Sequence, residues 1–65
     1  MGSKLMTLYE GTFKVEPVNK LKSGKYSYTV EVWETYQWKK KPGVWRILST
    51  SATPGGIQIT FQEVI

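Results

Sequence analysis

The stretch YSYTVEVWETYQW, residues 26–38, decides the fold of this 65-residue chain. Apart from Trp33 and Glu34, its large apolar residues occupy every second position and its polar residues lie between them. This period of two, rich in β-branched and aromatic residues, indicates a β-strand with one buried face. A strand of this length spans roughly 40 Å at about 3.3 Å per residue. Since that exceeds the diameter of so small a domain, we expect the strand to bend or to protrude as an arm.

The segments on both sides of this stretch alternate in the same way. Gly11 lies inside the first of them and indicates a bulge or a close backbone approach. The third predicted strand carries bulky residues on both of its sides, so we expect it to be covered on both. The three further predicted strands span residues 6–16, 44–50 and 57–65, and the turns and loops span residues 19–25, 39–43 and 51–56.

No segment has helical periodicity, so we predict an all-β domain, a four- to five-stranded antiparallel meander. Its strands gather apolar residues on one face, and no helix is expected to cover them. Large exposed apolar patches are rare on soluble monomers. The sheet is therefore expected either to curl into a small SH3-like or OB-like barrel or to stack on a second copy as a dimeric sandwich. The predicted apolar face consists of Tyr9, Phe13, Val15, Tyr26, Tyr28, Val30, Val32, Ile57, Ile59 and Phe61.

The length and composition favour association with further copies of the chain. A chain of this size buries only about 60% of its unfolded surface, so a monomer is marginally stable. Small domains are usually reinforced by disulfides, metals or partner subunits. The chain has no Cys, His or Asp, which excludes a disulfide, a thiolate metal site and a histidine metal site. We therefore expect a homo-oligomer without metal or cofactor.

The N-terminal residues have the character of an expression leader. Met1-Gly2-Ser3 is a common leader sequence, and Lys4-Leu5 is encoded by a common cloning site. We expect residues 1–5 to be this leader and residues 6–65 to form a single all-β domain. The chain shows no apolar signal-peptide segment and no apolar run of about 20 residues. A cytoplasmic protein without a membrane span is therefore expected.

The inventory of catalytic side chains is poor, and no catalytic residue is predicted. Without His, Cys or Asp, no serine or cysteine triad can form. Glu31 and Glu34 are three residues apart on a strand, hence on opposite faces, and cannot act as a facing carboxylate pair. Glu34 interrupts the apolar face, so either that face has reached solvent or the carboxylate has a partner such as Arg46 or a lysine. We expect a non-enzymatic protein.

The whole chain has a net charge of +4, and basic and aromatic residues are interleaved in its second half. Single-stranded nucleic acids bind to surfaces where bases stack on aromatic rings and lysines neutralise phosphates. A β-ribbon with a basic tip can also enter a DNA groove. The alternative is an ordinary solvated hairpin whose lysines protect a sheet edge from aggregation. The predicted site for DNA or RNA consists of Tyr36, Trp38, Lys39, Lys40, Lys41, Trp45 and Arg46.

Trp33 is the residue that a one-sided core explains least. It lies on the face opposite Val30 and Val32 and either packs on Trp45 or Leu48 or anchors a partner protein. The second hypothesis is therefore a protein-interaction or assembly module, of the kind found among small accessory proteins of phages and mobile elements, acting as a homo-oligomer.

A third hypothesis comes from a resemblance. The segment Pro54-Gly55-Gly56-Ile57-Gln58-Ile59-Thr60 resembles the substrate-binding strand of the small type II dihydrofolate reductases, an SH3-like barrel family that acts as tetramers. The resemblance implies that Gln58 and Ile59 line a pore and that Lys22, in Lys22-Ser23-Gly24, attracts the phosphates of the cofactor. Thr60 stands where that family has tyrosine, and the intervening strands do not match.

Overall fold

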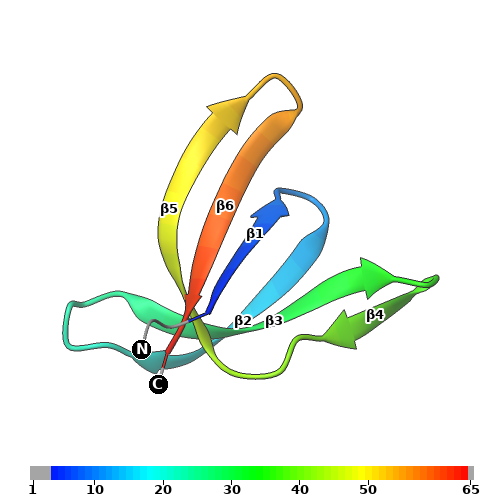
Figure 1. Cartoon of the computed structure of the whole chain (residues 1–65). Helices are drawn as coiled ribbons and strands as arrows, with labels where there is room; N and C mark the ends of the chain where they lie inside the picture. Colours follow the sequence, from blue (N-terminus) through cyan, green and yellow to red (C-terminus); the bar gives the residue numbers. More distant parts are fainter. Residues whose placement is uncertain (1–3, 65) are drawn as a thin grey trace.

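The computed structural model of the chain describes residues 4–64, which form a single antiparallel sheet of six strands without a helix (Figure 1). The all-β prediction is confirmed. The first three residues of the expected leader and the last residue of the final predicted strand, Ile65, lie outside the described range. The strands are β1 (Leu5–Tyr9), β2 (Phe13–Lys20), β3 (Tyr26–Glu34), β4 (Gln37–Lys40), β5 (Trp45–Thr53) and β6 (Gly56–Glu63).

The order of the strands in the sheet is β1-β6-β5-β3-β2, and β4 pairs with the end of β3. The strands β2, β3 and β4 follow one another as hairpins, as a meander requires. The first strand departs from a meander, because β1 pairs with β6 along Leu5–Tyr9 instead of with β2. Leu5 thus takes part in the sheet, and next to it the amide of Glu63 donates a hydrogen bond of 2.9 Å to the carbonyl of Lys4.

The sheet is strongly curved but not closed. Its two edge strands, β1 and β2, are joined by only the three residues 10–12, which forces the edges toward each other. No ladder joins β1 to β2 within residues 4–64, so the curved sheet stays open and is not a closed barrel. The β5–β6 hairpin and the β3–β4 hairpin extend away from the centre in different directions (Figure 1).

Two predicted strands are each divided by a turn, which raises the number of strands to six. Gly11, with φ +91°, lies in the turn between β1 and β2 instead of in a bulge. The long central strand reverses at Thr35 and Tyr36, whose φ angles are +48° and +61°. Positive φ at both central residues is the mark of a type I′ hairpin turn, which usually carries Asn-Gly. Because Thr35-Tyr36 lacks that signature, the alternation of apolar and polar residues in the sequence runs through the turn and does not reveal it.

The core lies inside the curve of the sheet, and the turn at Gly11 changes which residues reach it. Met6 and Leu8 face inward, whereas Tyr9 is 45% exposed, so the predicted alternation was wrong for β1. Tyr26 and Ile57 of the predicted face are also exposed, near the ends of their strands. The buried hydrophobic residues are Val30, Val32, Trp45 and Phe61, with Met6, Leu8, Phe13, Val15, Ile47 and Ile59 packed against them.

The strand β5 is covered on one side only, so the prediction of cover on both sides was wrong. Trp45 is buried and Ile47 packs against the core, while Arg46 and Leu48 are exposed. The register between β5 and β6 shifts between Ile47 and Ser49, which leaves Leu48 as an extra, unpaired residue. The described part of the chain contains no helix that is long and apolar enough to cross a membrane.

Candidate nucleic-acid interface

The β3–β4 hairpin, which has a two-residue turn, carries most of the predicted binding residues. Glu34 pairs with Gln37, Trp33 with Trp38 and Glu31 with Lys40. Directly opposed residues of an antiparallel pair point to the same side of the sheet. Trp33, Trp38, Glu31 and Lys40 therefore share the outer face, opposite the core. We call this surface, together with the turn residue Tyr36, the hairpin face.

Two aromatic rings of the hairpin face are open to solvent. Trp33 is 53% exposed and Tyr36, at the turn, is 93% exposed. The ring of Trp33 packs on Trp38, whose ring centroid lies 5.4 Å away in an edge-to-face arrangement, while Trp45 belongs to the core. The prediction that Trp33 lies outside the core is thus confirmed.

The ring of Trp38 is half-buried and contacts two neighbouring side chains. Lys14, on β2, pairs with Glu31 across the sheet, and its Nζ lies 4.2 Å from the centroid of the Trp38 ring. The ring of Trp38 is therefore in contact with a cation and with the ring of Trp33. This contact adds Lys14 to the hairpin face. Sequence reasoning missed it, since Lys14 and Trp38 are far apart in the chain.

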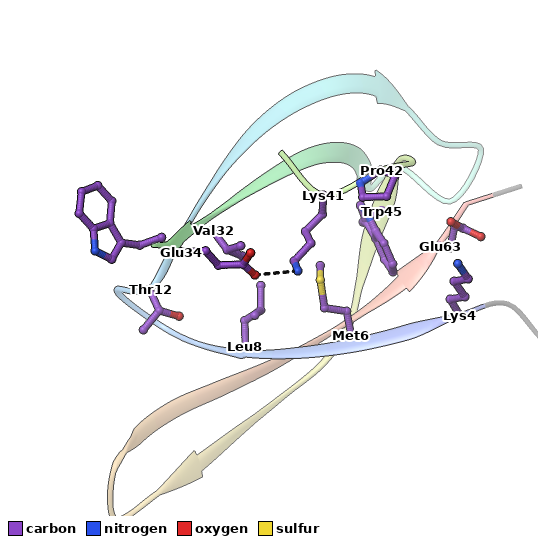
Figure 2. A pocket seen from close by; sticks show the side chains of 11 residues that line it. Lys4, Met6, Leu8, Thr12, Val32, Glu34, Lys41, Pro42, Trp45 and Glu63 are labelled. Carbon is purple, nitrogen blue, oxygen red and sulfur yellow. Dashed lines mark hydrogen bonds and ion pairs between the residues drawn. The ribbon is translucent and has the colours of Figure 1, made fainter. Parts of the chain in front are cut away.

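The three consecutive lysines divide between the two sides of the hairpin. Lys40 opposes Glu31 on the outer face, whereas Lys39 opposes Val32 on the side of the core. Lys41 follows Lys39 on that inner side and forms an ion pair with Glu34, with 3.0 Å between Nζ and Oε1 (Figure 2). Glu34 thus has the lysine partner considered above, and its side chain is still 46% exposed. Of the three lysines, only Lys40 lies on the same face as Trp33.

Arg46 lies far from this surface, near the turn between β2 and β3. The strand β5 meets β3 at the pair Tyr28–Trp45 and runs from there toward the start of β3. Arg46 consequently lines a hollow with Lys22 and Ser23, and its Nε donates a hydrogen bond of 2.9 Å to Oε1 of Gln62. Its grouping with Lys39–Lys41 was wrong, because the intervening turn carries the chain toward the other end of the sheet.

Trp45 is not available for stacking. It is 5% exposed and belongs to the core, so its place in the predicted binding site was wrong. The sequence indicated that Trp45 and Ile47 lie on one side of the strand and Arg46 on the other. It did not indicate which of the two sides faces the core. The structure therefore brings together Trp33, Tyr36, Trp38, Lys14 and Lys40, and it separates Arg46, Trp45, Lys39 and Lys41 from them.

The residues of the reductase-like segment do not share one surface. Gln58 opposes Tyr9, and its Nε2 donates a hydrogen bond of 3.4 Å to the Tyr9 hydroxyl. The next residue, Ile59, packs against the core. No group of three or more His, Cys, Asp or Glu side chains within residues 4–64 could hold a metal ion. Comparisons of the chain with models of protein families, with curated proteins and with solved structures found no match.

Proposed function

We propose that this protein is a non-enzymatic, cytoplasmic module that binds single-stranded DNA or RNA on the hairpin face. The observation that carries this proposal is the exposed ring of Trp33 on the same face of the sheet as the exposed cations Lys14 and Lys40, with the exposed ring of Tyr36 at the adjoining turn. The net charge of +4 attracts a polyanion to the molecule as a whole.

Single strands fit this surface better than a duplex does. The bases of a single strand can leave their own stack and lie on aromatic side chains, which contributes about 1–3 kcal/mol per base. In a duplex the base faces are covered by neighbouring pairs, so Trp33 and Tyr36 would gain nothing from it. The lysines then contribute by neutralising phosphates on either side of the stacked bases.

The salt dependence of binding tests the proposal. A fluorescently labelled pool of mixed single-stranded oligonucleotides is titrated with the protein at several salt concentrations, and the intrinsic fluorescence of tryptophan is followed in parallel. We expect the logarithm of the affinity to fall linearly with the logarithm of the salt concentration. Binding of a duplex of equal length is expected to be weaker. A tryptophan signal that ignores oligonucleotides at low salt contradicts the proposal.

Two adjacent lysines provide a matched pair of variants. Lys40 lies on the hairpin face and Lys39 on the opposite side, while both are exposed. We expect Lys40→Gln to lower the affinity and to reduce the salt slope by about 0.7, the value for one phosphate contact on a single strand. Lys39→Gln changes the net charge equally and is expected to keep the slope. Equal effects of the two variants would mean that net charge alone drives binding.

The rings are tested by Trp33→Ala and Tyr36→Ala. Each is expected to cost about 1–3 kcal/mol of binding free energy with little change in salt slope, because stacking releases no counterions. Both side chains are exposed, so the variants are expected to stay folded. Circular dichroism checks the fold, and unchanged affinity in both variants would remove the hairpin face from the site.

A second candidate function is self-assembly, which the small size of the core favours. Only four hydrophobic side chains of the described chain are buried, and a core of this size gives a monomer little stability. Sedimentation at several concentrations tests it, and an oligomer that Trp33→Ala dissociates in the absence of nucleic acid supports it. The large hydrophobic residues left exposed are Leu5, Tyr9, Val18, Tyr26, Trp33, Tyr36, Leu48 and Ile57.

A further inference from the structure

The outer half of β5, residues 49–53, has a neighbouring strand on one side only. It pairs with β6, whereas the single pair between β5 and β3 is Tyr28–Trp45, at the start of β5. No other ladder within residues 4–64 reaches these five residues. Figure 1 shows this half of β5 in the hairpin that extends away from the centre of the molecule. The backbone N–H and C=O groups on its other side therefore form an open edge, to which a further strand can pair.

The other open edges of the sheet are less accessible or carry features that prevent pairing. The open edges of β1 and β2 face each other across the gap in the curved sheet, because residues 10–12 join the two strands directly. The strand β2 also contains three charged residues, Lys14, Glu16 and Lys20, and Pro17, which has no N–H to donate. The strand β4 has four residues, two of which are lysines. Charges, proline and short length are the usual means by which proteins block an exposed edge.

The unpaired part of β5 has none of these features. Its sequence, Ser-Thr-Ser-Ala-Thr, contains no charged residue and no proline, and the register shift of β5 lies before it, next to Leu48. Residues 49–52 are exposed, and their small side chains leave the backbone of the edge accessible. Threonine, at two of the five positions, favours the extended conformation. This edge is therefore the one most open to an added strand.

The lack of charge favours a second copy of the chain as the partner. In a two-fold symmetric pair of antiparallel strands, the same segment contributes both sides of the contact. A charged residue near the axis would therefore meet the same charge on the partner, which is unfavourable. Residues 49–53 contain no such charge, and the nearest one on β5 is Arg46. A chain with a net charge of +4 thus has here an edge at which two copies meet without repulsion between their strands.

We propose that β5 pairs with β5 of a second copy, antiparallel and about a two-fold axis at Ser51, so that the two sheets join into one. Residues 49–53 are centred on Ser51, which consequently lies opposite its own copy. The contact consists mainly of backbone hydrogen bonds and buries a small area, so the dimer is weak and forms in a concentration-dependent manner. The proposal rests on self-assembly, the second candidate function, and does not involve the hairpin face.

Charge-swapped variants of an exposed residue test the pairing. Ser51→Lys and Ser51→Glu each place two like charges at the axis, so each variant alone is expected to dimerise about 2–5-fold more weakly than the unmodified chain. A mixture of the two variants is expected to associate again as a mixed dimer, because the charges at the axis are then opposite. Sedimentation of the full chain without nucleic acid, up to about 1 mM, measures the association. Thr7→Lys, on an exposed threonine of β1, is the matched control and is expected to change nothing.

A single cysteine tests the position of the axis. The chain has no Cys, so Ser51→Cys carries one thiol. Directly opposed residues of antiparallel strands have Cα atoms about 4.5–5.5 Å apart, within the range of a disulfide. Mild oxidation is expected to link Ser51→Cys into a dimer and to leave Thr7→Cys a monomer.

The two ways of failing are distinguishable. An unmodified chain that stays monomeric at every concentration overturns both this proposal and self-assembly. An oligomer that Trp33→Ala dissociates, and that Ser51→Lys leaves intact, overturns the β5 interface alone.

Discussion

The indole rings of Trp33 and Trp38 meet edge to face across the β3–β4 hairpin, with their centroids 5.4 Å apart and their planes at 69°. The two residues are directly opposed in the ladder, so the turn at Thr35 and Tyr36 determines that they meet. Lys14 on β2 lies over the Trp38 ring, so this contact ties β4 to β2 across the outer face of the sheet.

A double-mutant cycle of Trp33 and Trp38 is expected to give a coupling energy of about 0.5–1.5 kcal/mol, the value for an aromatic pair beyond its buried area. Trp38→Ala is expected to destabilise more than Trp33→Ala, because Trp38 also contacts Lys14 and is less exposed. Urea unfolding of the four proteins measures both effects. Additive effects of the two substitutions would show that the rings do not stabilise each other.

The turn of the β3–β4 hairpin is expected to have a strained backbone and to contribute to oligonucleotide binding. Thr35 and Tyr36 both adopt positive φ, which costs non-glycine residues about 1–2 kcal/mol each. Tyr36→Gly is therefore expected to raise the free energy of unfolding by about 1 kcal/mol and at the same time to weaken oligonucleotide binding, because the ring is lost. Thr35→Asn is expected to stabilise the fold without changing the affinity. Urea unfolding and oligonucleotide titration of each variant distinguish the two effects.

Two glycines are expected to differ in their tolerance of alanine. Gly11 has φ +91° in the turn between β1 and β2 and has no atom near the position of a Cβ, so Gly11→Ala is expected to cost about 1–2 kcal/mol from the backbone alone. Gly55 does not adopt a left-handed conformation, and its nearest neighbour, Thr53 Oγ1, lies 3.9 Å from a Cβ. Gly55→Ala is thus the matched control, and thermal unfolding should show it to be nearly neutral. Equal losses in both variants would contradict the role of φ.

Phe61 is expected to be the most sensitive core position. It is fully buried and its ring meets that of Phe13 edge to face, with 5.2 Å between centroids. Phe61→Ala is expected to cost about 3–5 kcal/mol, enough to unfold so small a domain, and Phe61→Leu considerably less. The control is Ile57→Ala on the same strand, which is 43% exposed and should lose under about 1 kcal/mol. Denaturant unfolding of the three variants measures the order.

The local pattern of residues determined the strands and their class. Val30 and Val32, like Ile59 and Phe61, are two positions apart and point to the same face. Side chains alternate between the two faces of a strand whichever strand lies beside it, so this pattern can be read from the sequence. Glycine and proline residues indicated the turns at Gly24 and Gly43, because the backbone preference of a residue is a local property. The absence of Cys, His and Asp likewise limits the chemistry wherever these residues would lie. The all-β class could therefore be predicted.

The tertiary structure alone decided which aromatic side chains are exposed. Trp33, Trp38 and Trp45 have the same intrinsic preference for burial, yet one is open, one supports a lysine and one lies in the core. A reversal of the chain at Thr35 and Tyr36, with no glycine to mark it, and a change of phase at Gly11 set these outcomes. Burial depends on what the rest of the sheet places opposite a residue, and that pairing joins segments far apart in the chain.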